Sequence, residues 1–160
     1  IKKEGFDPEN SAVLAPDIGS AAISQAYAKR LGMHFALIDK RRYAPNRAAI
    51  SHLIGELKNK NVLIIDDMID TAGTTVNAAE AAMEQGAKSV TAIATHGVLS
   101  GPALDKLRES SIRKIIITDT IETKEKKVLD NMDIVTVADV FGSAINRIHN
   151  DESVSALFKF

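Results

Sequence analysis

The feature that most constrains the fold is an unbroken apolar run from Val62 to Ile65. Such a run is typical of a strand that is buried on both faces of a parallel sheet. Further apolar runs of strand length occur at 13–15, 35–38, 90–94, 114–118 and 134–137. Helical patterns lie between and after them, at 21–31, 47–58, 74–85, 103–108 and 138–149. This alternation predicts one α/β domain over residues 1–160, with a mainly parallel sheet and helices on both faces.

Two of the expected helices have their apolar residues on one face. The helix over 47–58 has four apolar residues spaced i, i+3, i+4 and i+7, namely Ile50, Leu53, Ile54 and Leu57. The helix over 21–31 has its apolar residues on one face as well: Ile23, Ala26, Tyr27 and Leu31.

Size, charge and cysteine content exclude several classes of protein. A chain of 160 residues can form one ordinary domain with a core. Its net charge of −1 argues against a nucleic-acid partner, which would require a basic surface. The absence of cysteine excludes disulfides, thiolate metal sites and a cysteine nucleophile, and it fits the reducing cytoplasm. No apolar run approaches the roughly 18 residues needed to span a bilayer, so we expect no membrane partner.

The segment after Ile65 has the chemistry of a sugar-phosphate site. Two adjacent carboxylates, Asp66 and Asp67, follow the buried strand at its carboxyl end, where open α/β sheets bind ligands. A loop of small residues then enters a helix, and its backbone N–H groups and hydroxyls can bind a phosphate. The candidate residues in this loop are Asp70, Thr71, Ala72, Gly73, Thr74 and Thr75.

The acid pair and the threonines also have simpler interpretations. Carboxylates repel phosphate, so Asp66 and Asp67 are better suited to vicinal hydroxyls or to a divalent cation held by oxygens. Acids before a helix can instead cap it, and Thr74 and Thr75 could be ordinary N-caps. Walker A spacing and a dinucleotide-binding glycine fingerprint are both absent.

The complete string from Val62 to Thr75 resembles the phosphoribosyl pyrophosphate (PRPP) motif of type I phosphoribosyltransferases and PRPP synthetases. Three other segments, 36–42, 95–103 and 152–158, are similar to ribose-phosphate pyrophosphokinases, the PRPP synthetases. The resemblance covers nearly the whole chain in unbroken order. It implies a phosphoribosyltransferase-like fold and places the chain at the carboxy-terminal domain of such an enzyme.

The resemblance implies a reaction and its catalytic residues. The anomeric hydroxyl of ribose 5-phosphate would attack the β-phosphorus of ATP with Mg²⁺ present, giving PRPP and releasing AMP. Lys40 and Arg42 fall in the family's mobile catalytic loop, where cations offset the crowded phosphate charge. Asp17 falls where the family has an acid beside the Mg–ATP site, although an aspartate there can also simply form a turn.

Other positions match the family in part. Ser153 and Ser155 correspond to an allosteric phosphate or ADP site between subunits. Three positions depart from the family: Ser20 replaces a usual glycine, and Ile23 and Gln25 stand where arginines are common. These departures leave open a non-catalytic regulatory homologue beside the synthetase.

The chain begins at Ile1 and already reads as the middle of a fold, so we expect that an amino-terminal domain precedes it. The resemblance implies that this other domain contributes to ATP binding and that subunits assemble as dimers and hexamers. A purine or pyrimidine phosphoribosyltransferase is the remaining alternative. It would need a hood for the base, and no such insertion is visible.

Overall fold

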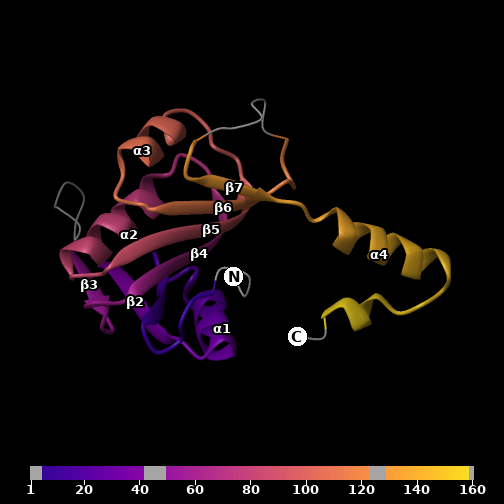
Figure 1. Cartoon of the computed structure of the whole chain (residues 1–160), viewed down its shortest axis with the longest axis horizontal. Helices are drawn as coiled ribbons and strands as arrows, with labels where there is room; N and C mark the ends of the chain where they lie inside the picture. Colours follow the sequence, from indigo (N-terminus) through magenta and orange to yellow (C-terminus); the bar gives the residue numbers. More distant parts are fainter. Residues whose placement is uncertain (1–4, 42–49, 123–128, 159–160) are drawn as a thin grey trace.

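The computed structural model describes residues 5–41, 50–122 and 129–158 (Figure 1). Its elements, in chain order, are β1 (Ser11–Ala15), α1 (Ala21–Leu31), β2 (His34–Arg41), β3 (Ile50–Ile54), β4 (Asn61–Ile69), α2 (Gly73–Glu84), β5 (Ser89–Gly97), α3 (Ala103–Glu109), β6 (Lys114–Thr118), β7 (Met132–Val135), α4 (Ala138–His149) and the 3₁₀ helix η2 (Val154–Phe158). In the described ranges the strands form one sheet of order β3-β2-β1-β4-β5-β6-β7.

The sheet is parallel except at one edge, where β3 runs antiparallel to β2. Strand β1 lies inside the sheet between β2 and β4, and the chain reverses its direction of travel across the sheet there. Such a switch point creates a crevice outside the carboxyl ends of the strands, where α/β proteins bind ligands. The topology therefore places the carboxyl ends of β1 and β4 beside each other, at the position where α/β folds bind ligands.

Helices cover both faces of the sheet, as the sequence predicts. Successive side chains of a strand point to opposite faces, so Leu14 packs with α2 and α3, whereas Val13 packs with α1. The larger cluster includes alanines of α2 and Leu107 of α3, and the smaller one includes Ala28 of α1. The predicted α/β class and mainly parallel sheet are therefore confirmed.

The helix predicted over 47–58 is wrong, because residues 50–54 form strand β3. Its pairing with β2 gives the backbone hydrogen-bond partners outside the segment, and this outweighs the helical spacing of the apolar residues. Leu57 still reaches the core, where it is fully buried. Gly55 ends the strand at φ +108°, and a Cβ there would lie 2.7 Å from the carbonyl oxygen of Phe35. Only glycine fits this turn.

The bounds predicted for the first helix are confirmed, but its buried residues are not those of its apolar face. The buried residues of α1 are Ser24 and Ala28, whereas Ile23 and Tyr27 are exposed. Small side chains allow α1 to lie close to the sheet, where the Ser24 hydroxyl donates to the carbonyl oxygen of Ile65 at 3.2 Å. This buried hydrogen bond ties α1 to the strand that delivers the acid pair.

Strand β4 is longer than expected and extends through Ile69, so the predicted loop begins at Asp70 and not at Asp66. The extension is paired with β5, where Met68 lies opposite His96 and Ile69 opposite Gly97. A Cβ at Gly97 would lie 2.5 Å from Cδ1 of Ile117, so a larger residue there would force the Ile117 side chain to move. The acid pair therefore lies within a strand that is paired on both sides of it along β5.

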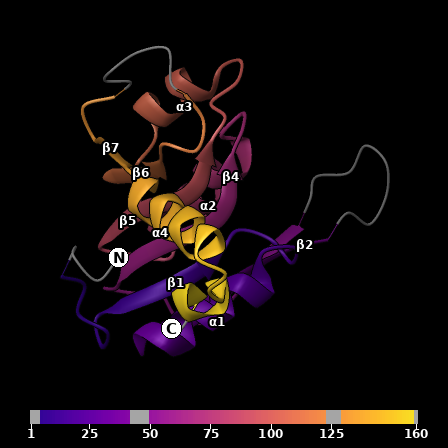
Figure 2. The ribbon, with the colours of Figure 1, turned by 90° about the vertical axis from the view of Figure 1, so that its right-hand side faces the viewer.

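The last helix is where the sequence predicts it, but it does not pack on the sheet. Helix α4 projects from the body, and η2 folds back beside it (Figures 1 and 2). None of the residues of α4 is buried, and its apolar side chains Val140, Phe141, Ile145 and Ile148 are all exposed. We call residues 138–158 the arm and the rest of the described chain the body. In the described ranges no helix has the length and apolarity that a membrane crossing requires.

Candidate functional site

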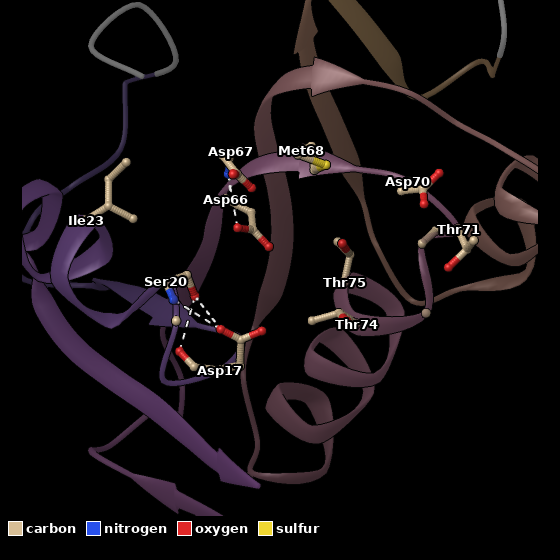
Figure 3. A pocket seen from close by; sticks show the side chains of 13 residues that line it. Asp17, Ser20, Ile23, Asp66, Asp67, Met68, Asp70, Thr71, Thr74 and Thr75 are labelled. Atoms are coloured by element: carbon tan, nitrogen blue, oxygen red, sulfur yellow. Dashed lines mark hydrogen bonds between the residues drawn. The ribbon is translucent and has the colours of Figure 1, made fainter.

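A pocket of about 640 Å³ opens at the carboxyl ends of β1 and β4. Figure 3 shows its lining from β4 and α2 on one side and from the turn after β1 on the other. The lining residues are Asp17, Gly19, Ser20, Ile23, Asp66, Asp67, Met68, Asp70, Thr71, Ala72, Gly73, Thr74 and Thr75. The structure therefore brings together Asp17 and every residue of the predicted phosphate loop.

The amino-terminus of α2 is open toward this pocket. Ala72 is its N-cap residue, with φ +60°, and no side chain caps the helix. The first helical backbone bond runs from Val76 N–H to the carbonyl oxygen of Ala72 at 2.9 Å. Thr74 and Thr75 lie inside the helix, so they are not its N-caps. The N–H groups of the first turn have no partner within a helix, and together with the helix dipole they form an anion site.

The acid pair lies on the last part of β4, one side chain toward each face of the strand. The Asp66 side chain lies on the face of β4 that α2 covers, and it faces Thr75 across the pocket (Figure 3). It accepts a hydrogen bond from the backbone N–H of Asp67 at 3.0 Å. Burial raises the pKa of Asp66, and the neighbouring carboxylates of Asp67 and Asp17 increase it further. The charged form of Asp66 is therefore disfavoured, and a hydroxyl donor or a cation in the pocket would stabilise it.

Asp17 is held in place by the residues that follow it. Its Oδ1 accepts the backbone N–H of Ser20 at 3.0 Å and the Ser20 hydroxyl at 3.3 Å. A Cβ at Gly19 would lie 3.2 Å from the same oxygen, so glycine leaves room for this turn. The serine that departs from the family pattern thus orients Asp17. Of the other two departures, Ile23 lines the pocket, whereas Gln25 is exposed and is not part of the lining.

The segment after β5 supports the phosphate loop from behind. The backbone N–H groups of Leu99 and Ser100 donate to the carbonyl oxygens of Ile69 and Asp70, at 3.0 and 3.1 Å. The Ser100 hydroxyl also donates to the Asp70 carboxylate. We call these three bonds the loop brace. The resemblance had marked the 95–103 segment without a role for Ser100, and only the fold reveals its contact with Asp70.

The remaining predicted residues lie elsewhere. Lys40 lies in strand β2, opposite Ser51 of β3, and not in a loop; Arg42 lies outside the described residues. Ser153 and Ser155 lie on the arm, where the backbone N–H of Ser155 donates to the Ser153 hydroxyl at 3.2 Å, and neither lines the pocket. Met68 is a lining residue that the sequence analysis missed, because the segment was expected to be a loop.

A family model described as the phosphoribosyl synthetase-associated domain matches residues 42–159. The chain belongs to this family. It is 45% identical over 158 residues to a ribose-phosphate pyrophosphokinase of Fusobacterium nucleatum, and 47% identical over 150 residues to one of Caldanaerobacter subterraneus. These alignments cover 99% and 94% of the chain, but 50% and 48% of the relatives. The chain thus spans about half the length of the curated relatives it matches.

Solved structures agree with this family assignment. The phosphoribosylpyrophosphate synthetase from Mycobacterium smegmatis superposes with a TM-score of 0.84 at 32% identity, over 94% of this chain and 48% of that one. The APRTase from Giardia lamblia superposes with a TM-score of 0.51 at 18% identity, over 68% of this chain and 69% of that one, and shares the fold alone. The expected phosphoribosyltransferase-like fold of this synthetase-family domain is therefore confirmed.

Proposed function

We propose that the pocket binds ribose 5-phosphate, and that the whole protein transfers diphosphate from ATP to its anomeric hydroxyl, giving PRPP and AMP. The observation that carries the proposal is the uncapped amino-terminus of α2 beside the Asp66 carboxylate. The anion site suits the phosphate group of a sugar phosphate, and the adjacent carboxylate suits the hydroxyl groups of its sugar. The names of the relatives and their coverage of the chain support the synthetase over a phosphoribosyltransferase.

In this proposal each part of the pocket has its own task. The first turn of α2 and the hydroxyls of Thr71 and Thr74 bind the 5-phosphate. Asp66 and Asp67 accept hydrogen bonds from the ribose hydroxyls, which hold the anomeric oxygen in a fixed direction. Holding both reactants in one geometry can supply much of the rate enhancement of such a reaction. Lys40 and Arg42 provide the positive charges that offset the negative charge of the transferred diphosphate.

Mg²⁺ is the cofactor that we propose for this site. Among the described residues, no cluster of three or more acidic, histidine or cysteine side chains is arranged to hold a metal ion. The available donors are single carboxylates, of which Asp17 has one oxygen already engaged by Ser20. Mg²⁺ commonly binds through one or two carboxylates, waters and substrate phosphates, and not in an all-protein cage. Asp17 therefore fits as one ligand of an ion that arrives with ATP.

The wider proposals follow from the family. Ser153 and Ser155 would bind a regulatory phosphate or ADP, the subunits would assemble as dimers and hexamers, and the enzyme would work in the cytoplasm. The family resemblance and the near-complete coverage of this chain by its relatives support these proposals. The amino-terminal domain, which we propose precedes this chain, would supply the remaining ATP contacts.

The activity is tested with the full-length protein, supplied with ribose 5-phosphate, Mg²⁺ and ATP, by following AMP release. We expect AMP and PRPP in equal amounts, and a large loss of both in the Asp66→Asn variant. Activity only with PRPP and a base would support a phosphoribosyltransferase instead. Retained ribose 5-phosphate binding without AMP release would support a regulatory homologue.

A further inference from the structure

We infer that Lys106, on helix α3, is a phosphate-binding residue of this pocket: its ammonium group approaches the phosphate loop at Gly73 and pairs with the 5-phosphate. This inference rests on the proposed function and adds to it a residue from a separate element. The predicted phosphate loop contains no cation of its own, and Lys106 supplies one from thirty-three positions further along the chain.

The geometry brings Lys106 to the loop. A Cβ built on Gly73 would lie 3.8 Å from Lys106 Nζ. Apart from the two residues next to Gly73 and the backbone of α2, no other atom of the described residues comes within 4 Å of it. Gly73 is the first residue of α2 and lines the pocket. The absence of a side chain there leaves the ammonium group next to the first turn of the helix, where the phosphate would bind.

Packing fixes the helix that carries Lys106. Ala103 and Leu107 of α3 are fully buried in the same cluster as Ala78 and Ala82 of α2. The backbone N–H of Lys106 donates to the carbonyl oxygen of Pro102 at 3.1 Å, so the residue lies in the first turn of α3. That turn follows directly after the loop brace. Lys106 is therefore held near the loop by the element that supports it.

The charge balance of the pocket calls for such a cation. Its described lining contains the carboxylates of Asp17, Asp66, Asp67 and Asp70 and no lysine or arginine. A phosphate monoester adds further negative charge, which the helix dipole offsets only in part. On α3, Arg108 is paired with Asp105 at 2.7 Å, whereas Lys106 makes no ion pair with any residue that the structure describes. Its ammonium group is available for a charge-assisted bond to phosphate.

The test is calorimetric titration of the chain with ribose 5-phosphate, comparing wild type with Lys106→Gln, Lys106→Arg and Lys88→Gln. Lys88 is another exposed lysine; it precedes β5, at the end of the strand far from the pocket. We expect Lys106→Gln to raise the Kd about five-fold at low salt, a difference that shrinks at high salt. Lys106→Arg and Lys88→Gln are expected to stay within about two-fold of wild type.

Titration with ribose separates a phosphate contact from a general defect. If Lys106→Gln weakens ribose 5-phosphate binding and leaves ribose binding unchanged, the assignment stands. Equal Kd values for wild type and Lys106→Gln, or an equal loss for Lys88→Gln, overturn it while the proposed function survives. Failure of wild type to bind ribose 5-phosphate removes the proposed function and this inference with it. Circular dichroism of each variant confirms that the exposed substitutions leave the fold intact.

Discussion

The body and the arm use apolar side chains in opposite ways. In the body, α2 buries only alanines and a threonine, yet it packs closely on the sheet. In the arm, α4 carries larger apolar side chains on one face and buries none of them. A strong apolar stripe is therefore evidence that a face can be covered, and it does not identify what covers it.

This difference separates two contributions of sequence to stability. Small residues stabilise the body because they let helices approach a sheet that is already paired, as Ser24 and Ala28 do on α1. Large residues on α4 stabilise little within this chain because their side chains stay in solvent. Four substitutions, from the largest expected effect to the smallest, test whether the body and the arm differ in this way.

Leu63→Ala in β4 is expected to have the largest effect. Leu63 is fully buried in the cluster beneath α1, and its removal leaves a cavity. The free energy of unfolding should fall by about 2–5 kcal/mol, as measured by urea denaturation with an unchanged m-value. A loss below about 1 kcal/mol would show that the body is not the close-packed unit described above.

Asp66→Asn tests whether the buried charge of Asp66, in the candidate site, lowers the free energy of unfolding of the body. Burial raises the pKa of Asp66 above its ordinary value of 3.8. A raised folded-state pKa means that the charged form is disfavoured in the folded protein, so the cost is fully present above the folded pKa and disappears as the pH falls toward 3.8. At neutral pH the variant should therefore unfold at a higher urea concentration than wild type.

The pH dependence separates charge from packing in this variant. The stability difference between Asp66→Asn and wild type should shrink steadily as the pH is lowered toward the ordinary value of 3.8. A difference that stays constant over this range would assign the gain to the amide's packing. A variant less stable than wild type at neutral pH would contradict the sign predicted from burial.

Phe141→Ser and Ile145→Ser in the arm are expected to have the smallest effects. These side chains are 59% and 65% exposed, so each change should alter the free energy of unfolding of this chain by no more than about 0.5 kcal/mol. The measurement is the same urea titration used for Leu63→Ala. A loss comparable to that variant would mean that α4 packs against the body in solution, which would end the contrast between the two regions.

Much of the fold could be predicted because strand and helix periodicities follow burial within the chain. The bounds of α1 and α4 agree with the sequence, and the strand predicted over 62–65 lies within β4. The 50–54 segment could not be assigned, because its partner β2 decides that it is a strand, and pairing is not encoded in local spacing. The buried face of α1 does not follow its apolar residues, because close approach to the sheet favours small residues such as Ser24 and Ala28.

The candidate site shows the same division. The segment from Asp66 to Thr75 is contiguous in sequence, so it could be predicted directly as one group of candidate residues. Asp17 needed the family resemblance. Ser100 and Lys106 reach the loop only through the pairing of β4 with β5 and the packing of α3, so no spacing in the sequence points to them. The roles of Lys40, Arg42, Ser153 and Ser155 stay predictions.

The loop brace has a consequence for the order of folding. Its side-chain bond joins Asp70 and Ser100, which are thirty positions apart, with α2 and β5 between them. The loop cannot take its supported shape until β5 has paired with β4, so contacts close in sequence do not suffice. During synthesis, a chain that ends before Ser100 would expose the phosphate loop without its support. The phosphate loop would therefore reach its supported conformation only after this whole β–α–β unit has left the ribosome.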